Sequence, residues 1–197
     1  MTETPTITGL RPVTVGPGRL ILVVGPSGAG KDTLLARARA ACAGDGSVVF
    51  ARRVVTREAT QFEENRQVSL DTFRQALARG EFAMHWEAHG HCYALSSAID
   101  DDIRAGRTVV ANVSRTVIEA MRRVYANVTV VTVTAPPEIL AERLNARARA
   151  SDGRLEDRLR RSLDGAKVAP DVIISNIGSV ELHAGELMEV IKGAAGR

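Results

Sequence analysis

The stretch Leu20-Ile21-Leu22-Val23-Val24 runs directly into Gly25-Pro26-Ser27-Gly28-Ala29-Gly30-Lys31-Asp32-Thr33. Five consecutive apolar residues predict a buried strand, and the residues after Lys31 predict a helix. Glycines let backbone N–H groups turn toward an anion, and the N-terminus of a helix adds partial positive charge. A tight glycine-rich turn without a ligand is the alternative. Strand, loop, lysine and helix in this order favour a phosphate-binding loop in which Lys31 contacts the outer phosphates of a nucleoside triphosphate.

The rest of the chain repeats the alternation of strand and helix. Apolar, β-branched runs predict strands over residues 20–24, 48–55, 108–113, 128–134 and 172–175. Helical patterns predict helices over residues 32–42, 70–79, 98–105, 117–125, 137–147, 154–166 and 180–191. Residues 81–95 break the alternation and predict a hairpin that turns at His89-Gly90. This order is typical of an α/β fold with a mostly parallel five-stranded sheet flanked by helices.

Length and composition limit the possible classes of protein. The chain has 197 residues, of which 45% are hydrophobic and 25% charged, as in one ordinary globular domain. Its longest apolar run, at residues 20–24, is far too short to span a bilayer. The net charge of +3 is weak for a nucleic-acid binder. We therefore expect neither a membrane nor a nucleic acid as partner, and we interpret residues 1–18 as a flexible tail before a domain over residues 19–197.

The number and spacing of the cysteines indicate the cellular compartment in which the protein works. Cys42 and Cys92 stand far apart and form no Cys-x-x-Cys pair, so neither a metal site nor a redox pair is indicated. A reducing cytoplasm fits this usage best. The oligomeric state is left open.

Four further segments carry a resemblance to a known family. They are Arg52-Arg53-Val54-Val55-Thr56-Arg57 with Glu64-Asn65-Arg66, the segment over residues 80–93, Val109-Val110-Ala111-Asn112-Val113-Ser114-Arg115, and the arginine-rich residues 143–158. With the phosphate loop, they make residues 19–191 similar to the guanylate kinase-like P-loop kinases. The pattern Phe82-Ala83-Met84-His85-Trp86-Glu87-Ala88-His89-Gly90 resembles more closely the ribose 1,5-bisphosphate phosphokinases of phosphonate catabolism.

The resemblance implies ATP as donor, bound by Gly25, Pro26, Ser27, Gly28, Ala29, Gly30, Lys31, Asp32 and Thr33. It implies an acceptor-binding region at about residues 56–97, and acceptor ligands at Arg57, Arg66, Tyr93, Ser114 and Arg115. Arg53 is a further candidate ligand of the acceptor phosphate. For Tyr93 and Trp86, a place in the hydrophobic core is the alternative to contact with the acceptor. Met84 and Cys92 replace the base-reading Glu and the phosphate-binding Tyr of guanylate kinases. Recognition of a nucleobase on the acceptor is therefore expected to be lost.

Two substitutions within the family pattern concern Mg²⁺. Asp32 stands where Ser or Thr normally offers a hydroxyl to the ion, and Asn112 stands where guanylate kinases have an Asp. A carboxylate oxygen is a suitable ligand for a hard cation. The carboxylate lost at Asn112 is thus returned by Asp32, which we interpret as an Mg²⁺ ligand.

The arginine-rich segment resembles the family's lid, expected at about residues 147–158. Arg147 and Arg158 match its best-placed arginines, and the resemblance gives them, with Lys31, the catalytic roles of bridging the substrates and stabilising the transferred phosphoryl group. An ordinary charged helical face is the alternative for this run.

The resulting hypothesis is transfer of the γ-phosphoryl group of MgATP to ribose 1,5-bisphosphate, which yields 5-phosphoribosyl 1-diphosphate. Guanylate kinase, or another nucleoside monophosphate kinase, is the second hypothesis. A non-catalytic interaction module related to guanylate kinases is the third, although such modules typically lose the phosphate loop.

Overall fold

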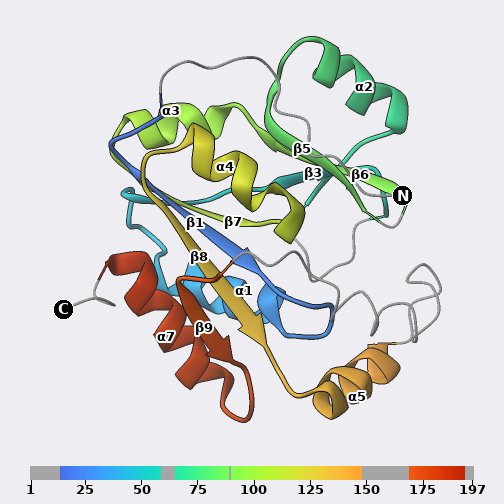
Figure 1. Ribbon diagram of the computed structural model, residues 1–197, viewed down its shortest axis with the longest axis vertical. Helices are drawn as coiled ribbons and strands as arrows, with labels where there is room; N and C mark the ends of the chain where they lie inside the picture. Colours follow the sequence, from blue (N-terminus) through green and yellow to red (C-terminus); the bar gives the residue numbers. More distant parts are fainter. Residues whose placement is uncertain (1–13, 59–64, 89, 148–168, 194–197) are drawn as a thin grey trace.

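Five parallel strands form the central sheet of the computed structural model, which describes residues 14–58, 65–88, 90–147 and 169–193 (Figure 1). Their order across the sheet is β2-β7-β1-β8-β9. The bounds are β1 Arg19–Val24, β2 Val48–Phe50, β7 Thr108–Asn112, β8 Val128–Thr134 and β9 Val172–Ser175. Since β1 lies in the middle of this sheet, the loop that follows it emerges at the centre of the sheet's carboxyl edge. The predicted fold class is confirmed.

Alternate side chains of β1 enter two different cores, as the period of two in a strand requires. Leu20, Leu22 and Val24 pack with α3 (Ala98–Arg104) and α4 (Ile118–Val124). Ile21 and Val23 pack on the other face with α1 (Lys31–Ala41) and α7 (Val180–Lys192). All five side chains are at most 1% exposed. Figure 1 shows these two helix pairs on opposite faces of the sheet. Burial on both faces explains why β1 is apolar throughout.

A second, four-stranded sheet has the order β4-β3-β6-β5. Its strands are β3 Arg53–Val55, β4 Arg66–Gln67, β5 Phe82–Ala88 and β6 His91–Ser96. Helix α2 (Leu70–Ala78) covers it by packing Phe73 and Ala76 against Phe82. Strands β5 and β6 pair antiparallel, which confirms the hairpin predicted over residues 81–95. His89 of the expected turn lies outside the described residues, and Gly90 adopts a φ of 75°.

The single strand predicted over residues 48–55 is wrong. The chain leaves the central sheet after Phe50, where β2 pairs with β7, and enters the second sheet at Arg53, where β3 pairs with β6. Two short strands of two different sheets therefore follow each other without a turn signal between them. Apolar periodicity identifies extended chain but does not reveal which sheet each part joins.

The remaining elements lie near the carboxyl edge of the central sheet or beside it. The 3₁₀ turn η1 (Arg115–Val117) follows β7, and α5 (Pro137–Arg147) follows β8. The helix predicted over residues 154–166 lies outside the described residues, as do residues 1–13 of the predicted tail. The described end of that tail is packed, since Val15 is 5% exposed and pairs with Tyr125. Among the described residues, no helix combines the length and apolar character that crossing a membrane requires.

Candidate active site

The loop between β1 and α1 keeps its shape because of its glycines. Gly25 has a φ of 146°, and a Cβ placed on it would lie 2.0 Å from the carbonyl oxygen of Val133 on β8. Gly30 has a φ of 87° and is the N-cap of α1. Only glycine adopts such positive φ values without strain, and only glycine fits so close to a neighbouring backbone. The loop is thus pressed against the sheet and ends at a helix N-terminus, where backbone N–H groups favour an anion.

Lys31 lies across this loop. Its Nζ donates hydrogen bonds to the carbonyl oxygens of Gly25 at 2.7 Å and Pro26 at 2.9 Å. The ammonium group is therefore held beside the backbone that a phosphate would approach. Ser27 and Thr33 are exposed, whereas Pro26, Gly28 and Ala29 are buried. The whole predicted stretch forms one loop and the first turn of α1, and its contact with ATP stays a prediction.

Asp32 and Asn112 meet beside the loop. Asn112 ends β7, the neighbour of β1, and its Nδ2 donates a 3.0 Å hydrogen bond to Oδ1 of Asp32 in the first turn of α1. Asn112 is 8% exposed. Its Oδ1 is buried and has no hydrogen-bond partner within the described part of the chain. A carboxylate and an unsatisfied amide oxygen therefore lie together next to the phosphate loop. The role of Asp32 as an Mg²⁺ ligand stays a prediction.

Of the predicted acceptor ligands, Ser114 and Arg115 follow Asn112 directly. The Ser114 hydroxyl caps η1 by accepting hydrogen bonds from the backbone N–H and the hydroxyl of Thr116. Arg115 begins η1, which packs against β5 of the hairpin. Arg115 is half-buried, and this burial lowers the pKa of its guanidinium group from a very high ordinary value. The guanidinium remains charged at neutral pH, so the start of η1 carries a positive charge beside Ser114.

The other predicted acceptor ligands belong to the second sheet. Arg57 follows β3, is partly exposed and donates a hydrogen bond to the carbonyl oxygen of Glu58. Arg66 is exposed on β4, beside β3. Tyr93 is 7% exposed and stacks on Trp86 with ring centroids 5.7 Å apart, so both rings belong to the core. The structure brings Ser114 and Arg115 to the phosphate-loop edge, while Arg57, Arg66 and Tyr93 lie on the neighbouring sheet.

The resemblance aligns Met84 and Cys92 with the base-reading and phosphate-binding positions of guanylate kinases, and both residues lie in the hairpin of β5 and β6. The Met84 side chain is completely buried in the core between the hairpin and the central sheet. Cys92 is half-buried, and its backbone N–H donates to the Thr56 hydroxyl at 2.9 Å. Burial raises the pKa of the Cys92 thiol, which is therefore protonated at neutral pH. Neither side chain offers a carboxylate to a guanine edge.

The predicted lid is only partly described. Arg147 is the last residue of α5, but its side chain lies outside the described part of the structure, and Arg158 lies wholly outside it. Their catalytic roles stay predictions.

Comparison with known proteins identifies the family of this chain. Residues 20–167 match the model of a family described as AAA domain. A protein of Bradyrhizobium diazoefficiens named ribose 1,5-bisphosphate phosphokinase PhnN is 59% identical over 93% of this chain and 92% of its own length. One of the same name from Rhodopseudomonas palustris is 61% identical over 90% of both chains, and one from Methylobacterium radiotolerans is 48% identical over 87% of this chain and 96% of its own. The chain belongs to the ribose 1,5-bisphosphate phosphokinase family.

A solved structure shows where the fold of this family lies among kinases. Guanylate kinase from Anaplasma phagocytophilum matches with a TM-score of 0.65 over 93% of this chain and 88% of its own, at 20% sequence identity. At that identity the similarity concerns the fold alone. The chain therefore shares the fold of a guanylate kinase, as the sequence predicted.

Sequence reasoning missed one buried polar contact beside the loop, that of Asn176 with Ala29. Asp100, Asn112, Asn176 and His183 are the buried polar side chains among the described residues. Asn112 was predicted from its motif, whereas Asn176 was not among the predicted site residues. No local pattern connects Asn176 to the loop, because its partner Ala29 is 147 residues away in sequence. Only the strand order brings the two together.

Proposed function

We propose that this protein transfers the γ-phosphoryl group of MgATP to the 1-phosphate of ribose 1,5-bisphosphate, forming 5-phosphoribosyl 1-diphosphate during phosphonate degradation. The observation that carries the proposal is the 59–61% identity, over at least 90% of the chain, to proteins named for this kinase activity. The phosphate loop with Lys31 across it supports the use of a nucleoside triphosphate.

The chemistry of the acceptor matches the residues present. A phosphate group with a second pKa near about 6 is mostly dianionic at neutral pH, so it needs no general base to become a nucleophile. One of its oxygens attacks the γ-phosphorus, and the bond to the bridging oxygen of ADP breaks. The main barrier is bringing two polyanions together in line, which cations overcome by positioning and charge stabilisation. Lys31 holds the donor, and Arg57, Arg66 and Arg115 are the cations that we assign to the acceptor.

The residues beside the loop fit a magnesium ion. Asp32 supplies a carboxylate, and Asn112 supplies a buried amide oxygen that has no partner among the described residues. Oxygen ligands of this kind suit Mg²⁺, which usually keeps several waters and binds one or two protein groups together with substrate phosphates. When bound, the ion neutralises part of the negative charge on the triphosphate. We assign Asp32 as its ligand.

We also assign roles to two arginines of the predicted lid and a compartment to the protein. Arg147 and Arg158 close over the donor and stabilise the charge that spreads over the transferred phosphoryl group. Both cysteines are free, in keeping with a reducing cytoplasm as the working compartment. The partners are then small molecules, ATP and a sugar bisphosphate.

The test is a comparison of acceptors. Purified protein with MgATP is given either ribose 1,5-bisphosphate or GMP, and ADP formation is followed. We expect kcat/KM to favour the sugar bisphosphate by about 100-fold or more, because a buried Met84 cannot replace hydrogen bonds to a guanine edge. Identification of the product by phosphorus NMR confirms the diphosphate linkage. A preference for GMP would refute the proposed substrate.

A further inference from the structure

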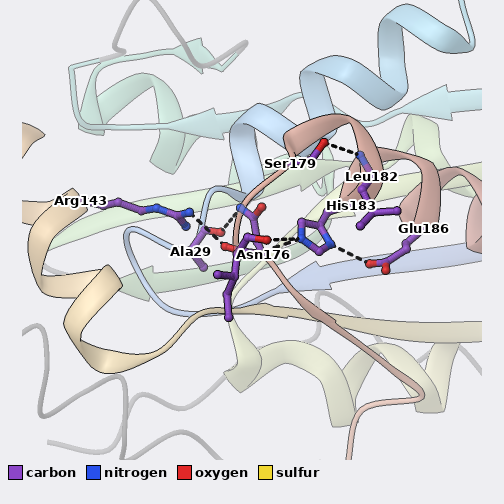
Figure 2. Close-up of polar contacts among 8 residues, drawn as sticks. Ala29, Arg143, Asn176, Ser179, Leu182, His183 and Glu186 are labelled. Carbon is purple, nitrogen blue, oxygen red and sulfur yellow. Dashed lines mark hydrogen bonds and ion pairs between the residues drawn. The ribbon is translucent and has the colours of Figure 1, made fainter.

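Asn176 joins the strand at the edge of the central sheet to the phosphate loop. It follows β9, and its backbone N–H donates to the carbonyl oxygen of Thr134 at 2.8 Å, which continues the pairing with β8. Its side chain is 3% exposed, and Nδ2 donates a 2.7 Å hydrogen bond to the carbonyl oxygen of Ala29 (Figure 2). This buried contact crosses from the edge strand to the central loop.

The contact fixes the orientation of one peptide group of the loop. A Cβ on Gly30 would lie 2.2 Å from Nδ2 of Asn176, so the amide packs directly on the Ala29–Gly30 peptide. In a planar trans peptide, the C=O and the following N–H point in opposite directions. Holding the Ala29 carbonyl toward Asn176 therefore turns the Gly30 N–H away from it. In a phosphate loop such N–H groups are the ligands of the anion.

Asn176 is itself held from two helices. Arg143 of α5 donates to its backbone carbonyl at 3.0 Å. The next residue, Ile177, is held by His183 of α7, whose Nε2 lies 2.9 Å from the Ile177 carbonyl oxygen and whose Nδ1 lies 3.0 Å from Glu186. Figure 2 shows Arg143 and His183 reaching the Asn176 segment from opposite sides. The asparagine therefore has a fixed position from which to orient the loop.

We propose that Asn176 is a positioning residue for the donor: its side-chain amide holds the Ala29–Gly30 peptide in the orientation that binds the phosphates of the nucleotide. This inference rests on the proposed use of the loop for ATP. It assigns a functional role to the residue that follows the edge strand and lies 147 positions away from Ala29 in sequence.

The test compares the binding of two ligands, one that carries a nucleobase and one that consists of the phosphates alone. Dissociation constants of MgATP and of magnesium tripolyphosphate are measured by calorimetry for the wild type and for Asn176→Ala. We expect both constants to rise about 3- to 10-fold, the effect of losing one neutral hydrogen bond that orients the loop. Asn176→Leu, whose branched side chain resembles that of asparagine in shape but has no donor, is the second variant if the alanine variant does not fold, and we expect the same rise in both constants.

Asn127→Ala is the matched control. Its Nδ2 also donates to backbone carbonyls, those of Pro17 at 2.8 Å and Gly18 at 3.3 Å, but at the amino edge of the sheet. We expect this variant to lower Tm and to leave both dissociation constants within twofold of the wild type, because its lost bonds do not orient the loop.

Two results would overturn the inference. One is a folded Asn176 variant whose constants for both ligands stay within twofold of the wild type. The other is a loss confined to MgATP, which would indicate a contact with the base instead of the loop. A wild-type protein that binds MgATP but does not phosphorylate ribose 1,5-bisphosphate would refute the proposed function, while the two constants would still decide the role of Asn176.

Discussion

Asp32 and Asn112 are two departures from the guanylate kinase pattern that the fold brings side by side. The loop position that usually carries a hydroxyl carries the Asp32 carboxylate, and the strand end that carries a carboxylate in guanylate kinases carries the neutral Asn112. The 3.0 Å hydrogen bond between the two side chains shows that they occupy one site. A second carboxylate at 112 would stand directly against Asp32, and like charges at this distance repel. The neutral Asn112 avoids this repulsion and donates a hydrogen bond to Asp32.

The corresponding prediction is an exchange of the two side chains. We expect Asp32→Ser to raise the Mg²⁺ concentration for half-maximal activity by about 10-fold, because the site loses its carboxylate. Asn112→Asp alone should lower Tm through repulsion with Asp32. The double variant, with one carboxylate again, should return to within about threefold of the wild-type Mg²⁺ requirement. Initial rates against free Mg²⁺ at saturating ATP measure this. An unchanged requirement in Asp32→Ser would show that the two positions do not compensate each other.

At the scale of elements, the sequence predicted those parts of the fold that depend on residues close together in the chain. The loop after β1 is defined by adjacent glycines and a lysine, and the hairpin of β5 and β6 by one turn, so both are confirmed. The division of residues 48–55 between two sheets could not be predicted, because β2 pairs with β7 and β3 with β6 through contacts far away in sequence. The contact of Asn176 with Ala29 could not be predicted either, because the two residues lie 147 positions apart in sequence.

The link between β9 and α7 leads to a prediction on pH. The hydrogen bond to the Ile177 carbonyl, followed by that to Glu186, raises the pKa of His183 above its ordinary value near 6.5. The protonated form is thus favoured by folding, so its stabilising contribution is complete below about pH 6.5 and is lost as pH rises through the higher folded-state pKa. We expect the difference in free energy of unfolding between wild type and His183→Gln to be largest at acidic pH and to shrink above neutrality.

Urea unfolding at pH values from about 5.5 to 8.5 measures this difference. Glu186→Gln is the matched control, since it keeps the histidine and removes the carboxylate that helps to hold its proton. Its stability should depend less steeply on pH than that of the wild type. A difference between wild type and His183→Gln that is constant over the whole range would contradict the assignment.

At the scale of the whole molecule, the strand order concentrates chemistry at one edge. The phosphate loop follows β1, Asn112 ends β7 on one side of it, and Asn176 follows β9 beyond β8 on the other. Ligands of open α/β sheets bind outside the carboxyl ends of the strands. The hairpin reaches the same region through η1, which packs against β5. The proposed donor loop and the proposed acceptor residues Ser114 and Arg115 therefore lie at one edge of the central sheet.

The proposed binding of ATP at this edge should stabilise the whole folded domain. At 100 times its Kd, a ligand specific for the folded state contributes about 2.7 kcal/mol. For a domain of this size that corresponds to a rise in Tm of roughly 5–10 °C. We expect this rise with MgATP in the wild type. In Lys31→Ala the rise in Tm should be largely lost together with turnover, while the fold survives, because the ammonium lies across the loop.

Lys192→Ala at the exposed end of α7 is the control: it removes the same charge elsewhere and should keep the full rise. Differential scanning fluorimetry measures the three proteins side by side, and an equal rise in all three would show that the phosphate contacts do not depend on Lys31.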